Sequence, residues 1–258
     1  MDLIRFKESE LPMKDLEILG LAVDGQLRLK PDDLRSLLSG RRTSMLQLQN
    51  LRAENIKIKA MDAKISLTTG KDGSTDLLIH PVYRKPATPD FLDDHEAELL
   101  EKGEVANLQK LVTDNKGNKQ ELLVEYDPET HEFIVSDSEK ILAPDMVNGE
   151  FLTPAQKEKY RKGKEVEVAD HTKFSYSAVD AKGIRSDKVA LIASVLIDGG
   201  LSYVAYKGLN ALFNQKRDPA EAEKLSPGYH KVVADMEAEN PVLDNSHIQV
   251  DARRRVFR

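Results

Sequence analysis

The chain has 258 residues, of which 32% are charged and 5% are aromatic, and it contains neither Trp nor Cys. The absence of Cys excludes disulfides, thiol catalysis and Cys-ligated zinc, and it fits a reducing compartment. Few aromatic residues in a chain of this length indicate several small hydrophobic cores. The net charge of -6 at pH 7 disfavours capture of nucleic acid by the field of the whole chain.

The charge is unevenly distributed along the sequence. Residues 91–149 contain 15 Asp or Glu and 5 Lys or Arg, a balance of -10, whereas the flanking segments are close to neutral. An acidic middle repels phosphate, although a local basic patch is still compatible with nucleic-acid contact. The first residues, MDLIRFKESE, lack the apolar stretch of a signal peptide. The expected location is therefore the cytoplasm.

Residues 1–85 are predicted to form an N-terminal module of helices followed by a β-hairpin. The segments LPMKDLEILG and KPDDLRSLLSG combine a helical spacing of Leu with a terminal Gly, and Pro31 suits the first position of a helix. The segment NIKIKAMDAKISLTT then alternates apolar and polar residues, as a half-buried strand does. Residues 71–74 (Lys-Asp-Gly-Ser) are typical of a hairpin turn, and residues 75–83 return as a strand.

Two segments that start sixty residues apart indicate an internal repeat. DFLDDHEAELLEKG begins at Asp90 and EFLTPAQKEKYRKG begins at Glu150, and each places a capping residue, a short helix and a Gly after Phe-Leu. Both segments are followed by short predicted strands. We interpret residues 90–148 and 149–187 as two copies of a helix followed by a β-meander. In this interpretation Phe91 and Phe151 are equivalent buried anchors.

Residues 188–215 contain the most apolar stretch, KVALIASVLIDGGLSYVAYKGLNALF. A membrane-spanning helix needs about 20 apolar residues, but Asp198 would lie near its centre and residues 199–200 (Gly-Gly) would interrupt it. The favoured alternative is an α-hairpin with Asp-Gly-Gly at the reversal. The residues expected to bind a partner protein or a second copy of the chain are Leu196, Leu201, Val204 and Leu212.

Together these patterns predict an α+β fold. Small helix-plus-β-meander modules follow one another in series, and the apolar α-hairpin comes after them. Residues 216–258 are predicted to form a polar helix and a basic tail.

The sequence contains no pattern that indicates catalytic chemistry. Its six His residues have no tight metal-ligand spacing, and phosphate-binding, dinucleotide-binding and nucleophile-elbow motifs are missing from it. The acidic residues around Asp93 fit a helix N-terminus, and residues 127–130 (Asp-Pro-Glu-Thr) fit a turn. We therefore predict a protein without catalytic residues, metal ligands or a cofactor.

Two basic groups are candidates for weak contact with nucleic acid. One lies in the first module, where Lys57 and Lys59 alternate with Ile in the way of any strand with one face in solvent, and Lys64 belongs to the same group. The other lies in the tail, where binding to the acidic residues 91–149 is an equal alternative. The residues expected to contact nucleic acid are Arg41, Arg42, Arg253, Arg254 and Arg255.

Two parts of the sequence resemble known domain families. LPMKDLEILGL, the LLSG-RRT step and the strands after it resemble a domain of unknown function found in proteins of gut-bacterial conjugative and other mobile elements. The paired Phe-Leu segments, above all EFLTPAQKEKYRKGKEV, resemble a second domain that commonly follows the first. The resemblance covers residues 10–187 and implies an accessory factor of a mobile element. Some such proteins occur alongside topoisomerase-like proteins, but this sequence contains no topoisomerase core.

Three functions are compatible with these observations. The favoured one is a non-enzymatic interaction or scaffold protein of a mobile element, which binds a protein partner or itself through residues 188–213. The second is a nucleic-acid accessory protein that uses the basic groups. The third is a membrane-associated adaptor of a transfer or secretion machine.

Overall fold

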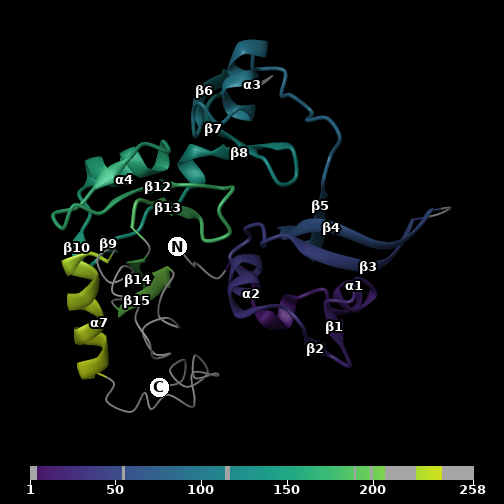
Figure 1. Cartoon of the computed structure of the whole chain (residues 1–258), viewed down its shortest axis with the longest axis horizontal. Helices are drawn as coiled ribbons and strands as arrows, with labels where there is room; N and C mark the ends of the chain where they lie inside the picture. The colour runs from purple at the N-terminus through teal and green to yellow at the C-terminus, as the bar shows by residue number, and fades with distance from the viewer. Residues whose placement is uncertain are drawn as a thin grey trace. The chain divides into compact units, whose positions relative to one another are not determined.

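The computed structural model describes residues 5–53, 56–113, 117–188, 190–197, 200–206 and 225–239 (Figure 1). It contains short helices and several small antiparallel sheets, which confirms the predicted α+β class. The chain divides into two compact units. The first consists of residues 1–143, 158–164 and 175–185, and the second consists of residues 144–157, 165–174 and 186–258.

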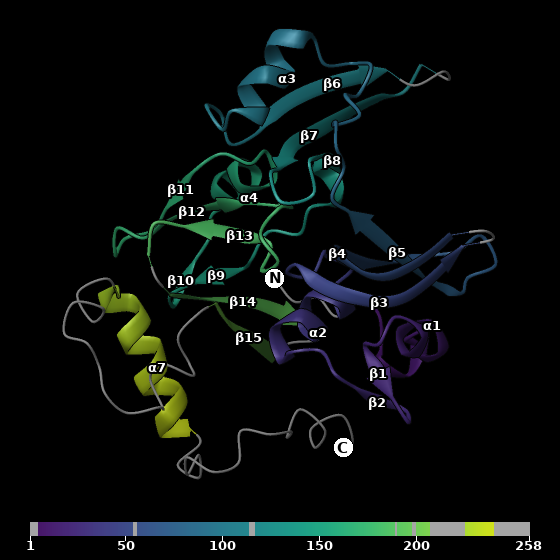
Figure 2. The same ribbon diagram turned by 45° about the vertical axis from the view of Figure 1, so that its right-hand side comes forward.

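The N-terminal part of the first unit contains the predicted helices and strands. Its elements are η1 (Glu8–Glu10), α1 (Met13–Ile18), β1 (Ala22–Val23), β2 (Gln26–Leu27), α2 (Pro31–Leu38), β3 (Leu46–Ala53), β4 (Ile56–Thr69) and β5 (Thr75–Pro81). The strand order β3-β4-β5 makes β4 the central strand (Figure 2). Ala63, Ile65 and Leu67 alternate on one face of β4 and pack into a core with Leu16 and Leu37. Lys64 and Ser66 therefore lie on the opposite face.

The rest of the first unit begins with the first copy of the repeat. Its elements are α3 (Asp94–Glu101), β6 (Leu108–Thr113), β7 (Lys119–Asp127), β8 (Glu132–Asp137) and η2 (Ser138–Lys140). The three strands form an antiparallel meander in chain order. One face of this sheet packs Val124 against Leu100 of α3.

The second copy has the same local structure sixty residues later. Its helix α4 (Pro154–Arg161) has the same length as α3, and it precedes β11 (Val166–Glu167), β12 (Lys173–Tyr176) and β13 (Ile184–Ser186). The side chains of Asp93 and Thr153 each accept a hydrogen bond from the backbone N–H three residues later. In return, the side chain of that later residue, Glu96 or Gln156, accepts a hydrogen bond from the backbone N–H of Asp93 or Thr153. Gly103 and Gly163 then adopt positive φ angles of 69° and 65°.

The expectation that Phe91 and Phe151 are equivalent buried anchors is wrong. Phe91 is partly buried against the first-repeat core, but Phe151 is 60% exposed. The residue that follows is buried in both copies, because Leu92 is 7% exposed and Leu152 is 6% exposed. Phe151 ends β10 (Glu150–Phe151), and adjacent residues of an extended chain point to opposite sides, so in the second copy Leu152 is buried while Phe151 faces outward.

The second unit contains a four-stranded sheet in the order β10-β9-β14-β15. Its strands are β9 (Met146–Val147), β10 (Glu150–Phe151), β14 (Leu191–Ile197) and β15 (Gly200–Tyr206), and its described helix is α7 (Pro227–Glu239). Ala190 and Ile192 pack against Tyr229, Val232 and Val233 of α7. This small core joins β14 to α7.

The α-hairpin predicted for residues 188–215 is wrong where the structure describes it. Residues 191–197 and 200–206 pair as antiparallel strands, in a register that runs from Leu191↔Tyr206 to Ile197↔Gly200. Buried apolar runs do not distinguish a helix from a central strand, which is covered on both faces. Here Leu191 and Ile192, which point to opposite faces, are both buried. None of the described helices is long and apolar enough to cross a membrane.

Asn148 connects several elements of the second unit. It has a positive φ angle of 48° between β9 and β10, where Asn-Gly supplies the two-residue turn. Its amide nitrogen lies 2.9–3.0 Å from acceptor oxygens of Asp170, Thr172 and Ser226, and its amide oxygen accepts a 3.0 Å bond from the backbone N–H of Ile192. Ser226 also accepts from the backbone N–H of Tyr229, so α7 begins at this junction.

Candidate functional site

One face of β7 presents three buried residues at alternate positions. Leu123, Glu125 and Asp127 share this face because side chains two residues apart in a strand point the same way. Val124 points to the other face, which α3 covers. Two carboxylates are therefore held out of water on the same side of one strand.

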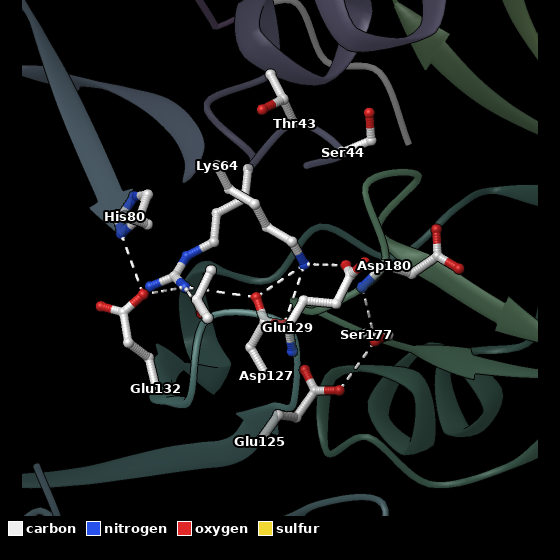
Figure 3. Close-up of polar contacts among 12 residues, drawn as sticks. Thr43, Ser44, Lys64, His80, Glu125, Asp127, Glu129, Glu132, Ser177 and Asp180 are labelled. Carbon is white, nitrogen blue, oxygen red and sulfur yellow. Dashed lines mark hydrogen bonds and ion pairs between the residues drawn. The ribbon is translucent and has the colours of Figure 1, made fainter. Parts of the chain in front are cut away.

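Asp127 forms a bidentate ion pair with Lys64 of β4. The Nζ atom of Lys64 lies 3.0 Å from Oδ1 and 2.8 Å from Oδ2 of Asp127, and these side chains are 2% and 0% exposed (Figure 3). Lys64 also lies 2.8 Å from the carboxylate of Glu129, which is 58% exposed. A buried charge pair of this kind is costly to break from one side, because the remaining charge has no compensation.

Arg42 extends the network on the side of β8. Its guanidinium donates a 2.8 Å bond to Glu132 and a 3.4 Å bond to the Thr130 hydroxyl, and it lies 3.6 Å from Asp127. Arg42 follows α2 in the sequence. Of its three partners, Thr130 lies in the turn between β7 and β8, Asp127 ends β7 and Glu132 begins β8. The ion pairs thus fasten the N-terminal part of the first unit to the first repeat.

Glu125 has a different environment from its neighbour Asp127. Its carboxylate accepts a 2.9 Å bond from the Ser177 hydroxyl and another bond from the Ala178 backbone N–H, while Arg185 lies 3.6 Å away. Burial raises the pKa of the Glu125 carboxyl above its ordinary value, and the hydrogen bonds from Ala178 and Ser177 oppose that rise. The charged form of Glu125 is therefore disfavoured by the fold.

His80 lies between Ser66 and Glu132 in the order of a serine-hydrolase triad. Its Nε2 atom is 2.9 Å from the Ser66 hydroxyl. Its Nδ1 atom is 3.6 Å from the Glu132 carboxylate (Figure 3). The second distance is too long for a hydrogen bond, and Glu132 accepts a 2.8 Å bond from Arg42. Burial lowers the pKa of the His80 imidazole, and the Arg42 guanidinium lowers it further. Ser66 is itself buried in mid-strand, so we interpret this group as packing rather than as catalytic machinery.

A pocket of about 360 Å³ adjoins the ion pairs. Its wall combines hydroxyl groups with charges of both signs. The lining residues are Thr43, Ser44, Lys64, Glu129, Ser177, Val179, Asp180, Ala181 and Arg185. Neither Ser66 nor His80 belongs to this lining, so the triad-like group does not open into the pocket.

The loop at residues 177–183 closes one side of the pocket. The Ala181 carbonyl accepts a 2.6 Å bond from the Ser36 hydroxyl and a 3.0 Å bond from Arg41 Nε. The Gly183 carbonyl accepts a 3.0 Å bond from the Tyr160 hydroxyl. Because the loop bonds to α2, α4 and β7 at once, it joins three parts of the first unit.

The basic residues that the sequence suggested for nucleic acid have other roles where they are described. Arg41 binds the loop carbonyl of Ala181, and Arg42 binds Glu132. Lys64 was grouped with solvent-facing residues, but it is buried. Residues 253–255 lie outside the described part of the chain.

The predicted partner-binding residues fall on the β-hairpin of the second unit. Leu196 is the cross-strand partner of Leu201, and Val204 is the partner of Ala193. The fourth, Leu212, lies outside the described residues. Strand pairing thus places Leu196 opposite Leu201, whereas Val204 lies three positions further along β15, and the hairpin that carries these residues is not helical.

Sequence reasoning missed Glu125, Asp127 and Asn148 as connecting residues. Asp127 was assigned to a turn, and it does accept a 3.0 Å turn bond from the Glu129 backbone N–H as well as binding Lys64. Two acidic residues at alternate positions after an apolar run are a signal for a strand that buries carboxylates. Asn148-Gly149 was a signal for a tight hairpin.

Comparison with known proteins identifies one domain. Residues 6–90 match a family described as a protein of unknown function (DUF4099). The matched segment contains Arg42, Lys64 and His80, which supply the N-terminal half of the charge network. No curated protein and no solved structure matches the chain.

Proposed function

We propose that this chain is a non-enzymatic interaction or scaffold protein and that it serves as an accessory factor of a mobile genetic element. The mobile-element assignment rests on the resemblance of the N-terminal module and of the paired Phe-Leu segments to domains of such elements. The interaction role rests on the second unit, at the outer edge of its sheet.

The observation that carries the interaction role is the position of β15. This strand pairs with β14 over seven residues, and its other edge pairs with no strand among the described residues. Its sequence, GLSYVAY, contains no charged residue and no Pro. Natural proteins protect exposed sheet edges with such residues, so an unprotected edge favours addition of a strand from a partner.

The first unit supports a scaffold rather than an enzyme. Its most deeply buried charged side chains, those of Lys64, Asp127 and Glu125, all bind groups of the protein itself. These contacts fasten separate segments of the unit to one another. A charge network that is used in this way gives a fixed arrangement of modules on which partners assemble.

Affinity purification from the native host tests this function with three forms of the chain. The unmodified chain is compared with Val204→Glu, which places a charge on β15, and with Val135→Glu, which adds the same charge to β8 in the other unit. Val135 is an exposed strand residue, so its substitution controls for added charge alone. Each captured protein is then purified and tested for direct binding.

The proposal requires a specific protein that binds the unmodified chain and Val135→Glu directly and that loses binding to Val204→Glu. An identical set of captured proteins for all three forms would show that the β15 edge is not the binding surface. Chemical conversion of a captured molecule by the purified chain would contradict a non-enzymatic role.

A further inference from the structure

The pocket beside the Lys64–Asp127 ion pair lies where three parts of the first unit meet. Lys64 comes from the N-terminal module, Glu129 comes from the first repeat, and the lining residues between 177 and 185 come from the second repeat. All of the lining residues belong to the first unit. A cavity of about 360 Å³ holds a small organic molecule, and ligand sites occur preferentially at such junctions.

The wall of the pocket is polar. Val179 and Ala181 are its apolar side chains, and every other lining residue carries a hydroxyl or a charge. A ligand that covers these groups without bonding to them would leave them unsatisfied, which is costly. The wall therefore selects a small ligand with polar groups of its own.

Lys64 offers no free donor to such a ligand. Its Nζ atom lies 3.0 and 2.8 Å from the two carboxylate oxygens of Asp127 and 2.8 Å from the carboxylate of Glu129. An ammonium group has three N–H donors, so these three contacts account for all of them. Figure 3 shows the Lys64 ammonium between the two carboxylates. An anionic ligand is therefore not recognised by Lys64.

Arg185 is the cation of the lining that retains donors for a ligand. A guanidinium has five N–H donors. The Nη2 atom of Arg185 makes a long 3.4 Å bond to the Ser177 hydroxyl and lies 3.6 Å from the carboxylate of Glu125. The side chain is 44% exposed on β13. A guanidinium with donors to spare fits a carboxylate, with which it forms two parallel hydrogen bonds.

Two other groups of the lining present acceptors. The carboxylate of Glu129 is 58% exposed and has acceptor positions beyond the one that faces Lys64. The Ser44 hydroxyl donates its proton to Asp33 over 2.7 Å, so its oxygen lone pairs remain for a ligand. Both groups favour a ligand that donates hydrogen bonds, and Glu129 favours a ligand group with positive charge.

We propose that this pocket binds a free amino acid, whose carboxylate pairs with Arg185 and whose ammonium group is held by Glu129 and Ser44. A zwitterion satisfies donors and acceptors of the wall together and adds no net charge beside a buried, compensated network. A phosphate or a nucleotide is disfavoured, because Arg185 alone would have to offset its charge next to Glu129.

This ligand would stabilise the arrangement of the first unit, because the residues that hold it come from all three of its parts. The pocket belongs to the first unit, whereas the protein-binding edge proposed above belongs to the second. Failure of one proposal therefore leaves the other intact.

Thermal unfolding of the full chain with each common amino acid, at about 10 mM, tests the proposal, because a ligand that binds only the folded state raises the midpoint. Isothermal titration calorimetry then gives the Kd of the amino acid with the largest effect. Two analogues of that amino acid are titrated as well. Its N-acetyl derivative lacks the ammonium group, and its amide lacks the carboxylate.

The test variants are Arg185→Gln and Glu129→Gln, each of which removes one charge from the lining. The matched controls, Arg28→Gln and Glu139→Gln, remove the same charges from exposed residues of the first unit outside the pocket. The unfolding midpoint of each variant without ligand verifies that it is folded. The analogues test the same two contacts on the unmodified chain, so the result does not depend on the variants alone.

At least one amino acid is expected to raise the midpoint of the unmodified chain. Both test variants are expected to bind it at least about tenfold more weakly, and both analogues to lose affinity similarly, because each change removes a charge-assisted hydrogen bond. Both controls are expected to bind as the unmodified chain does. The absence of a shift with every amino acid would overturn the proposal, as would equal losses in test and control variants. Undiminished binding of either analogue would overturn the contact assigned to the group it lacks.

Discussion

Lys64 and Asp127 lie 63 positions apart in the sequence, and their side chains form a buried bidentate ion pair with distances of 3.0 and 2.8 Å. Lys64 comes from the domain that matches a known family, and Asp127 comes from the first repeat. The pair therefore couples the stability of two modules that the sequence presents as separate.

Removal of Lys64 alone is expected to destabilise the first unit strongly. Lys64→Met leaves the Asp127 carboxylate buried without its main partner, which costs about 3–5 kcal/mol. The double variant Lys64→Met/Asp127→Leu is expected to recover most of this loss, because it removes both charges. Urea unfolding measures both values. Lys140, whose side chain is 82% exposed in its pair with Asp137, supplies the control, because Lys140→Met should cost less than about 1 kcal/mol. A double variant as unstable as the single one would contradict this account.

Ionisation of Glu125 is expected to make the protein less stable as pH rises. Because burial raises its folded-state pKa above the ordinary value of 4.5, the folded state holds the proton more tightly than the unfolded state does. Stability is therefore lost from about that ordinary value upward until the pH passes the raised pKa. Glu125→Gln, in which the amide can bond both Ser177 and Ala178, should be more stable than the unmodified chain at neutral pH and have a flatter profile. Denaturant unfolding across the pH range checks this, and parallel profiles would refute it.

The two repeat copies provide a matched pair of glycine substitutions. At Gly163 an added Cβ would lie 2.8 Å from both Asn107 Nδ2 and Leu123 Cδ1, whereas at Gly103 it would meet nothing within 4 Å. Both positions have positive φ, so Gly103→Ala should cost only the conformational penalty of about 1–2 kcal/mol. Gly163→Ala should cost clearly more, because it adds a steric clash to the same penalty. Thermal unfolding of the two variants gives the difference directly, and equal costs would mean that the loop moves aside freely.

Removal of the Asn148 side chain is expected to weaken the second unit. Asn148→Gly preserves the positive φ of the turn but leaves the buried Ile192 backbone N–H without its acceptor. An unsatisfied buried donor costs about 1–3 kcal/mol. Hydrogen exchange should show faster opening of β14 and of the first turn of α7, while β7 exchanges as before. Unchanged exchange in β14 would show that Asn148 does not connect these elements.

Much of the local structure could be predicted because its causes lie within a few residues. Asp93 and Thr153 mark the starts of helices, because their side chains accept hydrogen bonds from the backbone three residues later. Gly103 and Gly163 mark the ends of the same helices, because they adopt a positive φ angle that other residues avoid. The repeat was visible for the same reason. The hairpin of residues 191–206 was predicted as helical because an apolar run carries no period, and only pairing of β14 with β9 and β15 makes it a strand.

The sequence by itself determined the α+β class, the helix ends, the first hairpin and the sixty-residue repeat, because capping, turn chemistry and hydrophobic alternation act over short distances. Only the tertiary structure decided which of the charged side chains on β4 are buried and which are exposed. Lys57, Lys59 and Lys64 occupy one strand and look alike in the sequence, but Asp127 of β7 covers Lys64 and nothing described covers the other two. Whether a charged side chain is buried depends on which distant segment packs over its face, and no local pattern records that segment.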